Sequence, residues 1–302
     1  MKLLLSRAYG IAPLVLCLAT VGWGGNTIAS RMAVGEVSPM MLIFLRWGIV
    51  AILLVVLYGR EMRQAWPVMQ PRLGWIAMMG GLGMTVFNAL FYVAAHTTTA
   101  INLGIIQSMM PGMILLGSFL LFGTSIRLIQ GAGLVLTLVG VSVIVTGGSI
   151  ADLLVLQFNF GDLLMLVACL FYSSYTLGLR GRPQVSGFVM MGYFAIAAFM
   201  ATIPLVVIEY AYWGITWPGL KGWLIIFYVA IMPSFLSQVF FMRGVDLIGP
   251  GPAGLYANTV PIFSAIMAVV ILGEQFQSHH VLAMALVFAG IYLFEVRSKS
   301  SS

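Results

Sequence analysis

The chain has 302 residues, of which 61% are hydrophobic and only 7% are charged, and its formal net charge is +6. A water-soluble domain carries about 25% charged residues, so this composition excludes a soluble globular protein and indicates an integral membrane protein. The basic residues are scattered between apolar runs, which argues against nucleic acid as a partner, because such binding needs basic residues clustered on one soluble face.

Apolar stretches separated by charged and turn-forming clusters predict ten membrane-spanning helices. A helix needs about 20 mainly apolar residues to cross about 30 Å of hydrocarbon. The fold class that follows is an all-α membrane protein. The predicted spans are 9–30, 38–58, 73–95, 99–122, 127–147, 161–180, 186–209, 220–242, 251–273 and 279–296.

The second half of the chain repeats the first, which predicts two units of five spans each, 1–150 and 151–302. Five crossings invert the second unit relative to the first, and inverted repeats are typical of secondary transporters with a site near the midplane. The recurring pairs are Gly104 with Gly254, Pro111 with Pro261, and Gly123 with Gly273.

The Lys and Arg residues predict the orientation. With ten spans and a cytoplasmic N-terminus, nearly all of them fall on the cytoplasmic side, and only Arg31 and Lys221 fall outside. Cytoplasmic loops carry this excess of Lys and Arg. We therefore expect a multi-pass protein of a bacterial inner membrane with both termini in the cytoplasm.

Polar and aromatic side chains at helical spacing mark candidate cavity residues in the first and third spans. Trp23 and Asn26 share a face of the first span, and Asn88 and Tyr92, beside Phe87, share a face of the third. A polar row in lipid must face protein or water. Cavity lining and interhelical hydrogen bonding therefore both remain open for the first span.

The sixth and eighth spans offer a matching set. Ser234 and Gln238 lie one turn apart just after Pro233, and mirror the polar row of the third span, which suggests two walls of one cavity. Tyr172 and Tyr175 lie too far from the charged ends for an interfacial aromatic belt. They are predicted to line the cavity or to pack within the bundle.

The fourth and ninth spans carry polar residues before a proline in corresponding positions. Gln107 precedes Pro111, and Tyr256 and Asn258 precede Pro261. Helices weakened by Gly and Pro in both halves point to a transport site. Together with Pro233, the two prolines are expected to kink helices and to take part in gating.

Charged residues constrain the substrate. Arg46 lies inside the second span, where snorkelling or a pair with Glu36 or with backbone carbonyls is favoured over contact with a substrate carboxylate. Without an acidic residue at a predicted midplane, the expected movement is facilitative rather than proton-coupled. Spans four and nine lack Lys and Arg, which argues against a phosphorylated substrate.

The histidines and cysteines indicate neither catalysis nor a cofactor. His96 and the pair His279 and His280 lack a carboxylate at a helical spacing that would orient them, so a membrane-embedded enzyme is the least favoured alternative. Cys17 and Cys169 fall inside spans and suit neither a disulfide nor a metal cluster. No metal or cofactor is expected, and the glycine-rich spans leave monomer and dimer open.

Three short motifs carry a family resemblance over nearly the whole chain. They are Phe44-Leu45-Arg46-Trp47, Asn258-Thr259-Val260-Pro261, and Leu272-Gly273-Glu274 followed by Gly290. The chain resembles the EamA-type members of the drug/metabolite transporter superfamily, and within them the YddG-type exporters of aromatic amino acids. The resemblance implies a basket of ten helices around a central cavity, although the first half has Thr124 where the second has Glu274.

The sequence thus predicts an exporter of aromatic and other bulky neutral amino acids that works by alternating access. Its expected partners are the small-molecule substrate and membrane lipid. Export of drugs or lipophilic cations is the alternative, because Trp and Tyr faces bind cations without needing a carboxylate.

Overall fold

The structure is a computed structural model that describes residues 10–95, 97–98, 103, 106–149, 151, 159–273 and 275–296. Helix is the only regular structure in these residues. In hydrocarbon, a helix satisfies its backbone hydrogen bonds within one segment, which is why these apolar runs are helical. His96 and Glu274 lie outside the described residues.

The helices occupy the following ranges. In the first half they are α2 (Ala12–Ala33), α3 (Pro39–Met69), η1 (Gln70–Arg72), α4 (Leu73–Ala77), η2 (Met78–Val86), α5 (Phe87–Ala95), α7 (Met110–Phe122) and α8 (Leu128–Val145). In the second half they are α10 (Phe160–Gly178), η3 (Leu179–Gly181), α11 (Gly187–Tyr212), α12 (Leu220–Val229), η4 (Ala230–Leu236), α13 (Ser237–Ile248), α14 (Pro250–Leu255), η5 (Tyr256–Thr259), α15 (Val260–Leu272) and α16 (Ser278–Val296).

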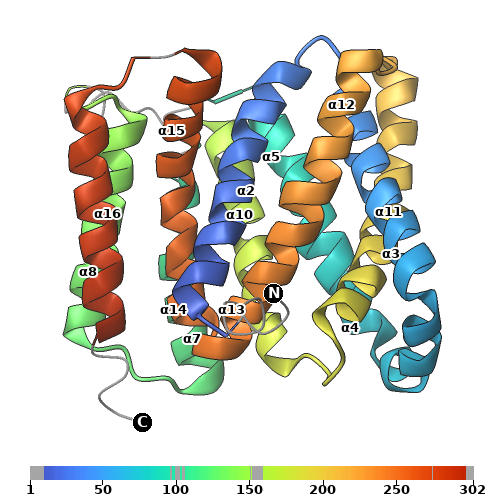
Figure 1. Ribbon diagram of the computed structural model, residues 1–302, viewed down its shortest axis with the longest axis horizontal. Helices are drawn as coiled ribbons and strands as arrows, with labels where there is room; N and C mark the ends of the chain where they lie inside the picture. Colours follow the sequence, from blue (N-terminus) through green and yellow to red (C-terminus); the bar gives the residue numbers. More distant parts are fainter. Residues whose placement is uncertain are drawn as a thin grey trace, which may run out of the picture.

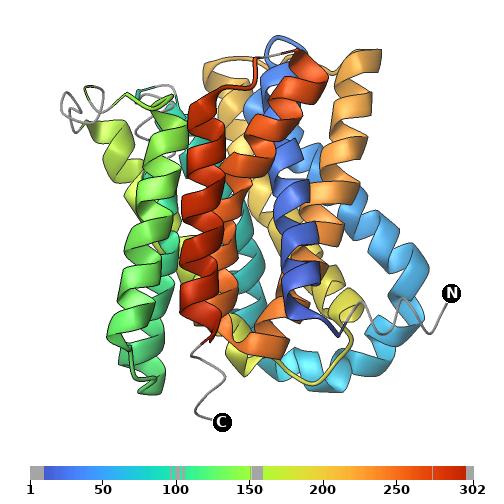
Figure 2. The same ribbon diagram turned by 60° about the vertical axis from the view of Figure 1, so that its left-hand side comes forward.

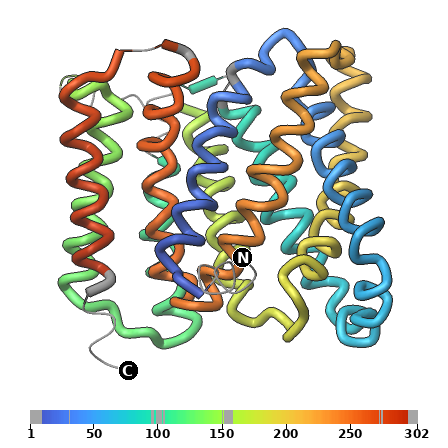
Figure 3. The backbone as a smooth tube through the Cα atoms, viewed as in Figure 1, coloured from blue at the N-terminus to red at the C-terminus, as the bar shows by residue number. Residues whose placement is uncertain are grey.

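Seven helical stretches of the described chain are long and apolar enough to cross a membrane, and Ile106–Phe122 and Ser278–Phe294 are shorter apolar helices. One of the seven, Pro39–Ala94, has 56 residues. At 1.5 Å per residue a straight helix of that length would reach roughly 84 Å, far beyond the thickness of a bilayer. Figure 3 shows that the chain instead descends along α3 and returns through α4, η2 and α5.

Most described helices match the predicted spans to within a few residues, but two run further. The second predicted span, 38–58, lies within a helix that continues through Arg60 and Arg63 to Met69. The eighth stretch likewise continues to Ile248. Charged residues end the hydrocarbon-crossing part of a helix without ending the helix, because Arg and Glu are good helix formers in water.

The helices form one bundle with a pair at each edge. Figures 1 and 2 show α16 beside α8 at one edge, and α3 packs on α11 at the other. Between the edges, α2 packs on α13 and α15, while α10 packs on α5 and α7. In Figure 1, α2 begins and α16 ends at the lower end of the bundle.

Three segments in the middle of the bundle depart from α-helical geometry. The η2 and η4 segments are π-helices, and η5 is a 3₁₀-helix. Pro233 lies within η4, whereas Pro111 and Pro261 lie in the first turn of α7 and α15. Proline fits a first turn because its missing N–H would have no partner there. Pro111 and Pro261 therefore begin helical segments rather than kink their interiors.

Gly133 brings α8 into backbone contact with α16. A Cβ added at Gly133 would lie 2.6 Å from the carbonyl oxygen of Gly290, which cannot move aside as a side chain can. Gly131, two residues earlier on α8, has nothing within 4 Å of the same added atom. The two glycines lie on the same helix, but α16 packs closely against Gly133 and not against Gly131.

We expect Gly133→Ala to lower the melting temperature of the detergent-purified protein, because overpacking at a close contact costs about 1–3 kcal/mol. Gly131→Ala is the matched control and should melt at or above the wild-type temperature, since alanine favours helix over glycine by about 1 kcal/mol. Equal melting temperatures for the two variants would contradict the close backbone contact between α8 and α16 at Gly133.

Candidate functional site

A cavity of about 370 Å³ lies in the middle of the bundle, among α2, α3, η2, α5, α7, α10, η4, α13, η5 and α15. Its polar or aromatic lining comes from both halves of the chain. The lining residues are Trp23, Asn26, Thr27, Ser30, Val34, Arg46, Trp47, Gly83, Met84, Phe87, Asn88, Phe91, Tyr92, Gln107, Met110, Tyr172, Pro233, Gln238, Ala257 and Val260.

Nine of the residues that the sequence singled out lie together in this lining. They come from five separate stretches of helix, so only the fold brings them to one place. These residues are Trp23, Asn26, Phe87, Asn88, Tyr92, Gln107, Tyr172, Pro233 and Gln238.

Aromatic rings form a continuous wall of the cavity. The ring centroid of Tyr172 lies 6.0 Å from that of Trp23, in an edge-on arrangement, and 5.1 Å from that of Phe87, in a tilted one. Trp23 also lies 5.1 Å from the ring of Phe241, which is fully buried. Aromatic pairs at these separations add to the stability gained by burial. The wall therefore presents rigid apolar faces to a ligand.

The amide side chains of the lining differ in whether their polar atoms have hydrogen-bond partners. Asn88 donates to the Met84 carbonyl one turn earlier, at 2.5 Å, and Gln238 accepts a hydrogen bond from the Tyr175 hydroxyl at 3.2 Å. The side-chain oxygen of Asn26 is buried and has no partner among the described residues. Buried polar atoms nearly always have partners, so this acceptor is available to a ligand.

Four predicted cavity residues lie outside the lining. Tyr175 and Ser234 are buried behind it and bond to lining residues, Tyr175 to Gln238 and Ser234 to Arg46. Tyr256 is buried, and Asn258 donates at 2.9 Å to Thr137 of α8.

One face of the turn formed by η5 and the start of α15 meets the cavity. Ala257 and Val260 are three residues apart, share that face and line the cavity. Tyr256 and Asn258 are two residues apart, so one helical face cannot hold both, and neither is in the lining.

Arg46 points into the cavity. The expectation that it would snorkel or pair with Glu36 is wrong, because Arg46 is only 4% exposed and Glu36 pairs with Lys221 at 3.0 Å. Its Nε donates to the Ser234 hydroxyl at 2.7 Å, and its guanidinium lies 5.5 Å from the ring centre of Trp47. Its Nη1 has no hydrogen-bond partner among the described residues.

Ser234 links Arg46 to the π-helix η4. Its hydroxyl accepts from Arg46 and donates to the Val229 carbonyl at 2.5 Å. Pro233 has no N–H, so it cannot give this carbonyl the usual α-helical hydrogen bond. The hydroxyl thus supplies a donor in a stretch of backbone that proline has weakened, and it fixes the position of Arg46 in the described lining.

The histidines do not contribute to the cavity as far as they are described. His279 and His280 lie at the start of α16, and the ring nitrogen Nδ1 of His280 accepts from the Gln277 backbone N–H at 2.9 Å. This bond satisfies one of the free N–H groups that every helix start exposes. His280 therefore has a capping role.

We expect Ser234→Ala to destabilise the protein by about 1–3 kcal/mol, because it leaves the buried Nε of Arg46 without an acceptor. The double variant Arg46→Met with Ser234→Ala removes both partners and should cost less than the sum of the single changes. Chemical denaturation in detergent measures the three free energies. If the double variant loses as much free energy of unfolding as the two single variants together, Arg46 and Ser234 are not coupled.

The chain resembles known proteins over nearly its whole length. YetK of Bacillus subtilis, an uncharacterized transporter, is 22% identical over 91% of this chain and 84% of its own length. The uncharacterized inner membrane transporter YedA of Escherichia coli K12 is 24% identical over 91% and 90%. A crystal structure that is 21% identical shares the fold, with a TM-score of 0.76 over 96% of this chain and 99% of the other.

The family follows from a match that occurs twice. The EamA-like transporter family matches residues 10–146 and, separately, residues 159–296. The matched stretches exclude only the two ends and the connection between the halves. This multi-pass membrane protein therefore belongs to the EamA-like transporter family.

Proposed function

We propose that the protein exports aromatic and other bulky neutral amino acids across the inner membrane through the central cavity, by alternating access. One observation carries the choice of substrate. Arg46 places an unpartnered guanidinium N–H in a cavity whose walls are otherwise aromatic or uncharged. The family supplies the transport activity, and the cavity supplies the chemistry of the ligand.

The cavity offers a partner for each part of such a molecule. A guanidinium binds a carboxylate through short, charge-assisted hydrogen bonds. The free oxygen of Asn26 suits an ammonium group, and the rings around Tyr172 suit an aromatic side chain. A cavity of about 370 Å³ lies near the small end of the usual range for ligand pockets.

Lipophilic cations are the second candidate, because the Trp and Tyr faces of the cavity can bind them. Arg46 weighs against this reading. A fixed positive charge in a low-dielectric cavity repels a cationic ligand, and like charges placed together cost several kcal/mol. We therefore favour a ligand with a carboxylate.

The proposed mechanism uses two inverted five-helix halves, giving ten crossings. The packing of α2 on α13 and α15 corresponds to that of α10 on α5 and α7, and in Figure 1 α2 and α10 run in opposite directions. Both α7 and α15 have 13 residues, a proline in the first turn and a left-handed glycine after the end, Gly123 and Gly273. Such pairing supports rocking of one half against the other.

Facilitative movement is supported by the placement of the buried carboxylates. Glu209 accepts hydrogen bonds at 3.0 Å from the backbone N–H groups of Met40 and Met41, at the start of α3. Asp162 likewise accepts from the Asn159 N–H at the start of α10. Both satisfy helix N-termini. The described lining of the cavity holds no carboxylate that could carry a proton.

A transport assay tests the substrate. Proteoliposomes with the purified protein should take up labelled phenylalanine faster than empty vesicles, and phenylethylamine, which lacks the carboxylate, should neither compete nor enter. Arg46→Met should lower phenylalanine uptake about tenfold or more, the cost of losing a hydrogen bond to a charged group. Arg63→Gln, which removes an exposed charge on α3, is the control.

Equal transport of phenylethylamine or a quaternary ammonium compound, unaffected by Arg46→Met, would favour the lipophilic-cation reading. Uptake of phenylalanine, tryptophan and methionine at the rate of empty vesicles would contradict the amino acid proposal altogether.

Transport should also be independent of a proton gradient. An imposed pH difference across the proteoliposome membrane should change neither the initial rate nor the final level of labelled phenylalanine. Accumulation above the external concentration, driven by the pH difference and abolished by a protonophore, would contradict facilitative movement.

A further inference from the structure

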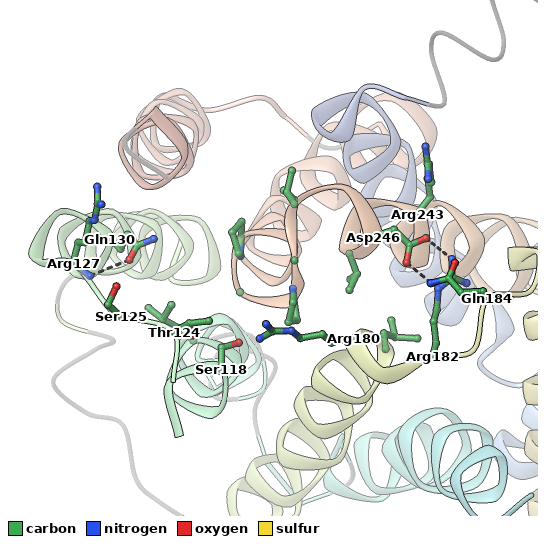
Figure 4. Close-up of a pocket in the computed structure, with 18 residues that line it drawn as sticks. Ser118, Thr124, Ser125, Arg127, Gln130, Arg180, Arg182, Gln184, Arg243 and Asp246 are labelled. Atoms are coloured by element: carbon green, nitrogen blue, oxygen red, sulfur yellow. Dashed lines mark hydrogen bonds and ion pairs between the residues drawn. The ribbon is translucent and has the colours of Figure 1, made fainter. Parts of the chain in front are cut away.

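A second cavity, of about 840 Å³, opens at the lower end of the bundle among the ends of α7, α8, η3, α13 and α14 (Figure 4). It shares no lining residue with the central cavity. Positive charge dominates its lining. The charged residues among its described lining are Arg127, Arg180, Arg182, Arg243 and Asp246.

The one carboxylate of this lining is already neutralised. Asp246 accepts from Nε of Arg182 at 2.8 Å and also from its Nη2. The remaining nitrogen of that guanidinium, Nη1, is buried and has no hydrogen-bond partner among the described residues. A guanidinium in this state still has a donor to offer to an anion.

Ser118 adds a second buried group without a partner. Its side chain lines the cavity and is 4% exposed, and its hydroxyl makes no hydrogen bond among the described residues. A serine within a helix commonly donates to the carbonyl four residues earlier, and this one does not. The hydroxyl faces α14, because an atom added at Gly251 would lie 3.8 Å from it.

Arg180 lies next to this hydroxyl. Its Cζ lies 4.3 Å from the ring centre of Phe122, which follows Ser118 by one turn on the same face of α7. In Figure 4 the Arg180 side chain extends toward Ser118, whereas Arg127 and Arg243 point away at the rim. The stacked guanidinium keeps its edge available for hydrogen bonds.

The general excess of arginine on one side of a membrane protein does not explain this arrangement. That excess concerns charges in loops, which water solvates. Here a hydroxyl and a guanidinium nitrogen are buried without partners, and buried polar atoms in native proteins nearly always have them. Figure 4 shows the two groups on opposite sides of the cavity, the Ser118 hydroxyl beside Arg180 and the Arg182 guanidinium beside Asp246, so the Ser118 hydroxyl and Arg180 form the candidate anion site.

We propose that this cavity binds a phosphate group beside α7, with the Ser118 hydroxyl as a donor and Arg180 as the cation. Guanidinium groups recognise phosphate well because its oxygens accept from several donors at once. The phosphate belongs to a free anion or to a lipid headgroup. The site is independent of the substrate proposed for the central cavity.

Titration calorimetry of the detergent-purified protein with inorganic phosphate, at constant ionic strength in chloride, tests the free anion. Wild type should show saturable binding that Arg180→Gln and Ser118→Ala each weaken about tenfold. Arg63→Gln removes an exposed charge outside the cavity and should bind as wild type does. Unchanged melting temperatures establish that the variants are folded.

Native mass spectrometry in mixed micelles tests the lipid. Wild type should retain phosphatidylglycerol in preference to phosphatidylcholine, and Arg180→Gln and Ser118→Ala should retain less of it than Arg63→Gln. Weaker binding in Arg180→Gln and Ser118→Ala, but not in Arg63→Gln, supports the site. The experiment in which it occurs shows whether the phosphate comes from a free anion or from a lipid. No specific loss in both experiments, or an equal loss in Arg63→Gln, overturns it.

Discussion

Hydrocarbon offers no hydrogen bonds, so every polar group inside the bundle must find its partner in protein or in a cavity. Where the helices depart from α-geometry, hydroxyls bond to the backbone carbonyls, as Ser234 does in η4 and Thr259 in η5. The buried carboxylates of Glu209 and Asp162 serve helix starts in the same way. Arg46 and Asn26 are among the exceptions, because Nη1 of Arg46 and the side-chain oxygen of Asn26 have no partner among the described residues, and both residues line the central cavity.

The interrupted segments also connect the cavity to movement. The π-helix η4 contributes Pro233 to the lining and, through Ser234, holds Arg46. Trp23 donates to the carbonyl of Pro233 at 3.3 Å, which ties α2 to the same segment. Irregular backbone is tolerated at membrane depth where it is buried in protein or lines a cavity. A ligand on Arg46 would thus act directly on a segment with weak backbone hydrogen bonding, which suits the proposed alternating access.

Some of the predicted cavity residues lie in the lining of the central cavity, and others lie behind it. Asn88 and Tyr92 line the cavity because an α-helical spacing of four places them on one face. Tyr256 and Asn258 lie two residues apart, so one helical face cannot hold both, and Ala257 between them lines the cavity instead. Local sequence pattern does not predict the position of the Arg46 side chain, because its hydrogen-bond partner, Ser234, is distant in sequence.

By itself, the sequence determined that the chain is a helical membrane protein, where its helices lie, and which polar residues are costly enough in lipid to need a cavity. Those properties follow from local composition and from the 3.6-residue period. Only the tertiary structure decided that Arg46 turns inward, that Asn258 bonds to α8, and that Ser118 and Arg182 keep unpartnered groups at a second cavity. Each depends on contacts between helices far apart in the chain, which no local spacing encodes.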